Sequence, residues 1–254
     1  MAYLTGGDPS PESFQVNSAA LVEGGADILE VGIPFSDPIA DGPVIQASSA
    51  RALSQGATPT IILDHIRKLS THIQVPIVVL TYYNPVLAMG RERFLERARD
   101  SGVNGLVIPD LPVEEGEEFV DLASKYSIDS ILLAAPNTSG ARLKKIVNLT
   151  RGFLYLVSLY GVTGPRDALS SQALGTVQRV KNLSAGKIPV SAGFGISNPE
   201  QVSSLISSGA DGAIVGSSLV NIVAQHLDQT DLAADLLKKT VAAFKQATRK
   251  RIES

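Results

Sequence analysis

The sequence predicts a protein of the α/β class, a single (β/α)8 TIM barrel domain over residues 1–254, and three observations support this. Short apolar runs with the composition of buried strands alternate with amphipathic runs of helical length. Eight such units occur, which is more than a doubly wound sheet usually contains. No linker rich in Pro, Gly and Ser divides the chain, so we expect one domain.

The strands are expected where β-branched and aliphatic residues cluster. Their predicted ranges are 2–5, 27–32, 76–82, 105–108, 129–134, 153–158, 188–191 and 211–215. The run 76–82, PIVVLTY, is nearly continuous in apolar residues, as in a parallel strand that is covered on both faces. A repeated pattern supports this spacing, because residues 24–27, 101–104 and 208–211 each combine a glycine helix stop with a polar strand start.

Helices are expected between these strands, where capping residues and prolines mark their first turns. The predicted ranges are 11–24, 44–55, 58–72, 91–100, 113–126, 139–149, 169–183 and 199–209, with further helix toward the C-terminus. Ser10 with Pro11 and Thr58 with Pro59 are typical start signals. Two of these helices follow the second strand, so that connection is unusually long.

Composition excludes several functional classes. A net charge of −3 without a long basic cluster argues against nucleic acid or an acidic membrane surface as the main partner. The absence of cysteine excludes disulfides, thiolate metal sites and a thiol nucleophile. The sequence shows neither an apolar run of membrane-spanning length nor a signal peptide pattern, so we expect a soluble cytoplasmic protein.

The most informative stretch is residues 30–46, EVGIPFSDPIADGPVIQ, because three carboxylates lie close together there. Glu30 lies near the end of a predicted buried strand, and Asp37 and Asp41 follow in a proline-rich loop. A buried carboxylate is costly, so Glu30 is either paired or used in chemistry. Such a set suits Mg²⁺ binding or metal-free acid/base catalysis, and the spacing alone does not separate these two.

Glycine-rich segments follow the last three predicted strands. They contain Gly164, Gly195 and Gly216, the last followed by Ser217. In barrels of this class, backbone N–H groups and a helix N-terminus after these strands often bind phosphate, so we predict a phosphate site. The third glycine of a dinucleotide fingerprint is missing, which argues against a nicotinamide cofactor.

Other strand-end residues narrow the chemistry further. No lysine or histidine is expected at a strand end, which argues against a Schiff-base aldolase and a histidine base. Tyr82, Tyr155 and Phe194 suit either core packing or the wall of a pocket for a flat aromatic substrate.

Residues 30–46 resemble ELGxPFSDPxADGPxIQ, the signature of the tryptophan synthase α subunit family, with Val31 in place of leucine. Other segments resemble that family in order and spacing: YLTGGDP (3–9), TYYNP (81–85), PDLPVEE (109–115), APN (135–137), YLVSLYGVTG (155–164), GFGIS (193–197) and VGSSLV (215–220). The resemblance therefore covers essentially the whole chain.

This resemblance implies retro-aldol cleavage of indole-3-glycerol phosphate to indole and glyceraldehyde 3-phosphate. It implies that Glu30 protonates the indole carbon that bears the side chain and takes the proton of the adjacent hydroxyl. Asp41 would accept a hydrogen bond from the indole N–H and stabilise the cationic intermediate. No metal and no cofactor are expected in this chain. Pyridoxal phosphate is expected in a partner β subunit, within an α2β2 assembly.

The resemblance also assigns the remaining site residues. Tyr82, Tyr155 and Phe194 would line the indole pocket. Phosphate would be bound by Gly164, Gly195, Gly216 and Ser217, and Thr163 would help to position Asp41. Pro34 and Asp37 lie in the loop that faces the β subunit in the family.

Two alternatives stay open at the level of the sequence. One is another phosphate-binding barrel enzyme of aromatic amino-acid or histidine biosynthesis, which would share the glycine segments. The other is a non-catalytic α-like activator of a β subunit.

Overall fold

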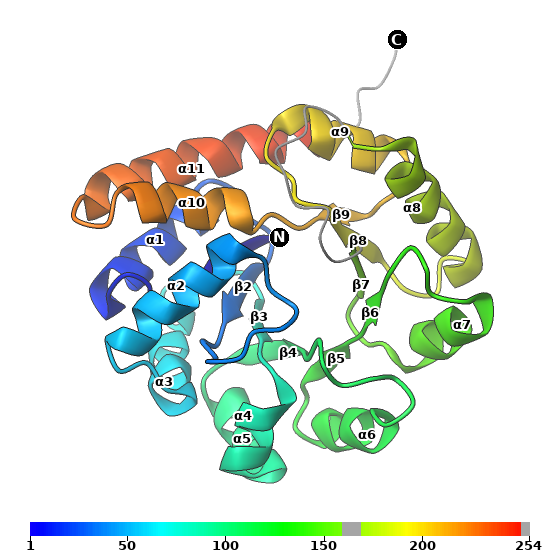
Figure 1. Ribbon diagram of the computed structural model, residues 1–254, viewed down its shortest axis with the longest axis horizontal. Coiled ribbons are helices and arrows are strands. Elements are labelled where there is room, and N and C mark those ends of the chain that lie inside the picture. The colour runs from blue at the N-terminus through cyan, green and yellow to red at the C-terminus, as the bar shows by residue number, and fades with distance from the viewer. Residues whose placement is uncertain (159–168, 250–254) are drawn as a thin grey trace.

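A computed structural model describes residues 1–158 and 169–249 of the chain, in which parallel strands form the centre and helices surround them (Figure 1). The strands are β1 (Ala2–Thr5), β2 (Leu29–Gly32), β3 (Ile77–Leu80), β4 (Val103–Val107), β5 (Asp129–Ile131), β6 (Leu133–Ala134), β7 (Leu154–Val157), β8 (Val190–Gly193) and β9 (Gly212–Ala213). All pairs are parallel, in the orders β1-β2-β3-β4-β5 and β6-β7-β8-β9.

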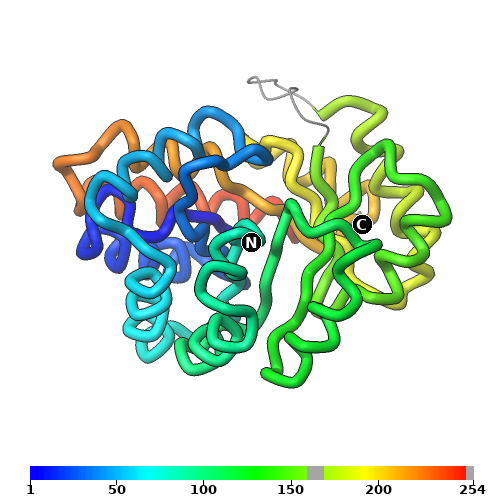
Figure 2. The backbone as a smooth tube through the Cα atoms, turned by 60° about the horizontal axis from the view of Figure 1, so that its bottom comes forward, coloured from blue at the N-terminus to red at the C-terminus, as the bar shows by residue number. Residues whose placement is uncertain are grey.

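The helices are α1 (Pro11–Glu23), α2 (Pro43–Ser54), α3 (Pro59–Ser70), α4 (Tyr83–Met89), α5 (Arg91–Asp100), α6 (Glu117–Lys125), α7 (Gly140–Leu149), α8 (Ser171–Ser184), α9 (Pro199–Ser207), α10 (Ser217–Gln225) and α11 (Thr230–Ala247). They follow the ring in chain order, and α11 returns to lie beside α1 (Figure 1). The turned view shows the same progression from the blue N-terminal part through green to red (Figure 2). In the described part of the chain, no helix is long and apolar enough to cross a membrane.

The ring closes between the first strand and the segment after β9. Ala2 forms a parallel bridge with Val215, the Tyr3 N–H donates to the Val215 carbonyl at 2.9 Å, and the Val215 N–H donates to the Met1 carbonyl at 3.0 Å. Between the two sheets, the Tyr155 N–H donates to the carbonyl of Leu132, which separates β5 from β6. The predicted (β/α)8 barrel is thereby confirmed.

Several expected elements differ in the structure. The strand predicted over 129–134 is two strands, because β5 pairs with β4 whereas β6 pairs with β7, and the change of partner falls at Leu132. The last expected strand, 211–215, is reduced to β9 and the single bridge at Val215. The helix expected from Val113 begins at Glu117, since a turn closed by the Glu115 N–H on the Pro112 carbonyl precedes it.

Helix α4 was not predicted, because the TYYNP segment has the composition of a loop. Its start is fixed by a distant residue: the Tyr83 N–H donates to the Asp110 carboxylate at 2.8 Å. Pro85 lies in the first turn, where a missing N–H costs no helical hydrogen bond. This start signal lies 27 residues away along the chain, so local sequence does not reveal it.

The alternation of side chains along the strands sets the direction of Glu30. Leu29 and Val31 are fully buried in the core under the helices, so Glu30 between them points into the barrel. Strand register places Glu30 level with Tyr3 of β1 and Val78 of β3. Val78 belongs to a small apolar cluster inside the barrel, which closes the space on one side of Glu30.

Two contacts attach α2 to the start of the chain. Arg51 makes a two-pronged ion pair with the buried Asp8, with both nitrogen–oxygen distances 2.8 Å. Thr5 of β1 shares a hydrogen bond of 2.6 Å with Ser48 in the middle of α2. These contacts hold the helix that directly follows the Asp41 loop.

Candidate active site

A cavity of about 230 Å³ lies at the ends of the strands, inside the ring of helices. It brings together six of the predicted site residues from distant parts of the chain: Glu30, Asp41, Tyr155, Gly195, Gly216 and Ser217. This position agrees with the place of catalysis in barrels of this class, which is the carboxyl end of the strands.

Glu30 is fully buried, and neither of its carboxylate oxygens meets hydrogen-bond geometry with any described group. Burial raises the pKa of Glu30 to about 8, and the charge of Asp41 adds to the increase. The Met1 ammonium group and the Tyr155 hydroxyl act in the opposite direction without cancelling the effect of burial. Glu30 is therefore largely protonated at neutral pH, and it can donate a proton.

Asp41 is only partly buried, and it follows a turn in which its N–H donates to the Pro38 carbonyl at 3.0 Å. Burial raises the pKa of Asp41 to about 6, and a hydrogen bond with Tyr82 opposes that increase. At neutral pH, Asp41 is therefore mostly charged while Glu30 is mostly neutral. Two carboxyl groups with different environments in one cavity are typical of divided acid/base roles.

The aromatic residues that were predicted together lie in different positions. Tyr155 forms part of the cavity wall. Tyr82 is buried below the Asp41 loop, where its hydroxyl accepts the Ala40 N–H at 2.9 Å and its ring packs on Phe35 with centroids 5.3 Å apart. Phe194 is half-buried against the core, and it is not among the residues that line the cavity. Tyr82 thus supports the loop that carries Asp41.

Gly195 and Gly216 line the cavity together with Gly193 and Ser217. Gly195 has φ of +70°, and a side chain there would meet no atom within 4 Å, so the backbone is open to a ligand. Helix α10 begins at Ser217, directly after Gly216, so its first-turn N–H groups lie at the cavity. A helix N-terminus beside an open glycine backbone favours an anion.

Some predicted residues lie elsewhere. Thr163 and Gly164 fall in residues 159–168, outside the described residues. Pro34 is buried and Asp37 is exposed, both in the loop after β2. Pro34 also lines a surface groove between this loop and α4. Within the described ranges, no three His, Asp or Glu side chains are grouped so that they could hold a metal ion.

Tyr3 is a cavity residue that the sequence analysis missed. Its strand was predicted, and the alternation of that strand would place Tyr3 and Thr5 on one face. Which face points inward depends on the pairing of Tyr3 with Glu30, and this register is known only from the structure.

Comparison with known proteins identifies the family. The family model described as tryptophan synthase alpha chain matches residues 1–249. A tryptophan synthase alpha chain of Methanoregula boonei is 44% identical over 247 residues, covering 97% of this chain and 92% of the relative. A tryptophan synthase alpha chain of Pyrococcus abyssi is 45% identical over 224 residues, covering 88% of this chain and 89% of the relative.

The fold agrees with the same family. A chain from the structure of the tryptophan synthase α2β2 complex of Pyrococcus furiosus is 42% identical to this chain, with a TM-score of 0.90. The alignment covers 96% of each of the two chains. Since the family model and these relatives cover nearly the whole chain, the protein belongs to the tryptophan synthase α chain family.

Proposed function

We propose that this chain acts as the α subunit of tryptophan synthase and cleaves indole-3-glycerol phosphate to indole and glyceraldehyde 3-phosphate, as a cytoplasmic carbon–carbon lyase of tryptophan biosynthesis. The observation that carries this proposal is the unpaired, buried carboxyl group of Glu30, which shares one cavity with Asp41 and with the open backbone at Gly195. The cavity thus offers a proton donor, a negative charge and an anion site.

The cleavage requires two proton transfers, both of which involve Glu30. Protonated Glu30 gives its proton to the indole carbon that bears the glycerol phosphate chain, which turns the ring into a cationic indolenine. The resulting carboxylate then takes the proton of the adjacent side-chain hydroxyl as the carbon–carbon bond breaks. Those bond electrons return to the ring, so indole and the aldehyde leave and Glu30 is protonated again.

Asp41 provides the charge for the intermediate step. When the indole ring is protonated at carbon, positive charge develops at the ring nitrogen, and a carboxylate that accepts the N–H hydrogen bond stabilises it. The partly buried Asp41 is suited to this role because it is mostly ionised at neutral pH. Tyr82 would act through the loop by holding Ala40 and Asp41.

The phosphate would bind at the glycine side of the cavity. Gly195, Gly216 and Ser217 offer backbone N–H groups and the start of α10 to the anion. Gly164 would add to this site and Thr163 would position Asp41, while Tyr155 and Phe194 would enclose the indole ring.

The partner in this proposal is a β subunit that carries pyridoxal phosphate and receives the indole. The similar Pyrococcus furiosus chain comes from an α2β2 complex whose subunits activate each other. Pro34 lines a surface groove of about 470 Å³ that also contains residues of α4, the exposed Asp37 follows directly after Ser36 of the same groove, and we assign the β subunit to this surface. This chain itself would need no cofactor.

The test is indole release from indole-3-glycerol phosphate by wild type and by Glu30→Gln, each with and without a β subunit. We expect the variant to lose about 10²- to 10⁴-fold in rate, because the amide keeps the shape but cannot exchange protons. Retention of more than about a tenth of the wild-type rate would remove Glu30 from the mechanism. A wild type that only stimulates the β subunit would be a non-catalytic activator, and one that ignores this substrate would be a different barrel enzyme.

A further inference from the structure

Helix α2 has a buried face that consists mostly of small and polar side chains. Its buried residues are Ile45, Ser48, Ser49 and Ala52, and of these Ile45 alone is large and apolar. Helix α3, which has the same length, buries isoleucine and leucine side chains instead. Small side chains interlock little with their neighbours, so apolar packing defines the position of α2 less well than that of α3.

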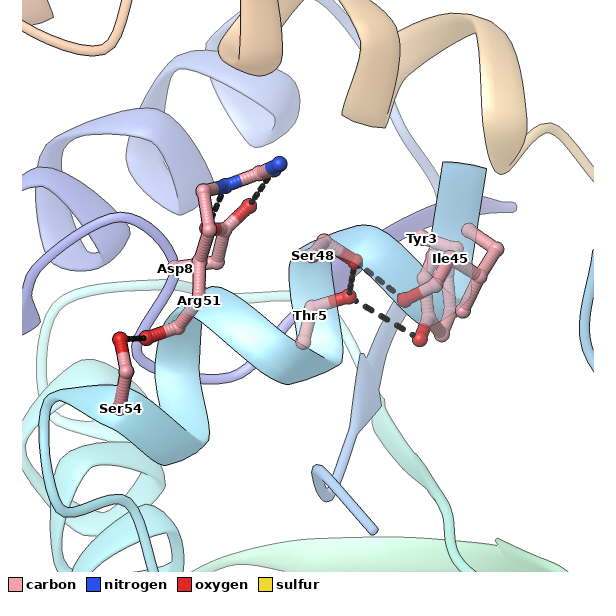
Figure 3. A network of polar contacts seen from close by, with 7 residues as sticks. All are labelled: Tyr3, Thr5, Asp8, Ile45, Ser48, Arg51 and Ser54. Carbon is pink, nitrogen blue, oxygen red and sulfur yellow. Dashed lines mark hydrogen bonds and ion pairs between the residues drawn. The ribbon is translucent and has the colours of Figure 1, made fainter. Parts of the chain in front are cut away.

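Two polar contacts connect this face of α2 to β1 and the turn that follows it, and Figure 3 shows both. Thr5 Oγ1 and Ser48 Oγ are 2.6 Å apart, and both side chains are buried. The Arg51 guanidinium group donates from Nε and Nη2 to the two carboxylate oxygens of Asp8, at 2.8 Å each. Ile45, Ser48 and Arg51 follow one another at helical spacing, so these contacts lie on the face that reaches the cavity at Ile45.

The Asp8–Arg51 ion pair contributes geometry more than stability. The Asp8 side chain is 3% exposed and that of Arg51 is 26% exposed. Burial raises the pKa of Asp8, and the contacts with Arg51 oppose this increase without cancelling it. Such a pair adds little stability compared with apolar side chains of similar size, because desolvation offsets the attraction. Two parallel hydrogen bonds nevertheless fix both the distance and the orientation of the partners, so the pair defines where α2 lies.

The other end of α2 is attached to Asp41. Pro43 begins the helix, directly after Asp41 and Gly42. The Gln46 side-chain amide donates to the Asp41 carbonyl at 2.8 Å, and the Gln46 N–H donates to the Gly42 carbonyl at 3.0 Å. Arg51 lies about 12 Å from Pro43 along the helix axis. Because a short helix moves as a unit, a displacement at Arg51 also displaces Asp41.

We propose that Asp8 and Arg51 are positioning residues, which hold the Asp41 carboxylate in the cavity by fixing the position of α2. The inference rests on the proposed function, in which Asp41 stabilises the cationic indole ring. Tyr82 holds the loop on the other side of Asp41, because its hydroxyl accepts the Ala40 N–H at 2.9 Å. Asp41 is thus positioned between two supports, Tyr82 before it and α2 after it.

The experiment replaces the ion pair by apolar side chains, in the double variant Asp8→Leu/Arg51→Met. One negative and one positive charge are removed together, so the net charge stays the same. The matched control is Asp64→Leu/Arg97→Met, which removes the aspartate–arginine pair between α3 and α5, 3.0 Å long. Large apolar side chains fix both of these helices, so their positions should not depend on the pair.

The first measurement requires no substrate. The pKa of Asp41 is followed in the whole free chain by carboxyl ¹³C NMR with labelled aspartate, and Asp41→Asn assigns the signal. Burial raises this pKa to about 6 in the wild type. In Asp8→Leu/Arg51→Met we expect a fall of about one unit, toward the ordinary value of 3.8, because a loosely held loop exposes the carboxylate to water. The control variant should keep the wild-type pKa.

The second measurement is kcat and KM for indole release, in the wild-type and Asp41→Asn backgrounds. We expect Asp8→Leu/Arg51→Met to lower kcat about tenfold with little change in KM, because the charge of Asp41 is used at the cationic intermediate. In the Asp41→Asn background, the same double change should lower kcat less than about twofold, since no charge remains to be positioned. General damage to the barrel would lower kcat equally in both backgrounds.

Urea unfolding checks that the double variant is folded, and Gln46→Met provides a second, milder variant. Gln46 is exposed, so its replacement leaves the core unchanged while it removes the bond between α2 and the Asp41 carbonyl. An unchanged pKa of Asp41 in the double variant, or in Gln46→Met if the double variant does not fold, overturns the proposal. Equal losses of kcat in the two backgrounds also overturn it. A wild type that releases no indole would instead overturn the lyase assignment, and the NMR titration would still decide the role of the ion pair.

Discussion

At the scale of single residues, burial separates the roles of two chemically similar side chains. Glu30 is enclosed on all sides and its pKa rises to about 8, whereas Asp41 is partly exposed and its pKa rises to about 6. The negative charge of Asp41 raises the pKa of Glu30 further, because it disfavours a second negative charge nearby. The ionised residue thus helps to keep its neighbour protonated.

Asp41→Asn should lower kcat more than it raises KM, because the charge of Asp41 matters most when the indole nitrogen becomes positive. A loss of about 10²-fold in kcat is expected, in the range of other preorganised electrostatic groups. Steady-state kinetics of indole release measure both constants. An effect confined to KM would reduce Asp41 to a substrate-positioning role.

At the scale of elements, the start of α10 and the turn after β8 form one wall of the cavity. Gly216→Val should weaken binding of glycerol phosphate, because a side chain at this cavity residue would crowd the start of α10 against Tyr3, whose nearest atoms lie 3.6 Å from an added Cβ. Calorimetric titration with each ligand should show about a tenfold loss of affinity for glycerol phosphate and little change in affinity for indole.

Gly195→Val tests the same wall from the other side, and Gly186→Val is its matched control. Both glycines have positive φ, +70° and +75°, and neither has an atom within 4 Å of an added Cβ, but Gly186 lies outside the cavity. Both changes carry the same backbone strain, so only a loss of phosphate binding at Gly195 supports the anion site. Equal losses in the two variants would point to backbone strain instead.

The loop between β2 and α2 joins the cavity to the proposed partner surface. Asp41 faces the cavity, whereas Asp37 is exposed and Ile39 has 76% of its surface exposed. Tyr82 holds the loop at Ala40. The proposed partner contact at Asp37 is therefore only four residues away from Asp41, the proposed second catalytic carboxylate.

A cognate β subunit should raise indole release by at least about tenfold, because ordering this loop increases the competent population. Asp37→Ala should reduce that rise more than it reduces the basal rate. Rates are compared at saturating substrate, with complex formation confirmed by sedimentation. Equal rates for the free and assembled wild type would contradict the role of the loop.

At the scale of the whole molecule, the buried carboxyl group of Glu30 lowers the stability of the fold when it is ionised. The pKa of Glu30 rises from 4.5 to about 8 on folding, so the native state favours the protonated form. Stability is therefore highest below about pH 4.5 as far as this residue is concerned, and it falls as the pH rises through about 8. Above that pH, the folded protein contains a buried and unpaired charge.

Glu30→Gln should accordingly be more stable than the wild type at alkaline pH, by roughly 3–5 kcal/mol, and should lose this advantage toward pH 4.5. Urea unfolding of both proteins at pH 5 and pH 9 measures the difference. Asp41 is present in both, so its own titration largely cancels. Parallel profiles of stability against pH for the two proteins would show that folding does not raise the pKa of Glu30.

The sequence by itself determined the alternation of strands and helices, and with it the barrel. Proline and capping residues such as Ser10 and Thr58 act within a few residues, and both cap their helices as predicted. The loop with Glu30 and Asp41 was likewise evident, because carboxylates beside a buried strand need a partner or a use. These are local consequences of residue type, so they can be inferred without tertiary contacts.

Only the tertiary structure decided which side chains meet. Helix α4 depends on Asp110, 27 residues away, and the division of β5 from β6 depends on which neighbour each strand pairs with. The place of Tyr3 beside Glu30 depends on strand register, which reverses the face of every side chain when it slips by one residue. Register and long-range hydrogen bonds arise from contacts between distant segments, so residue order alone does not specify them.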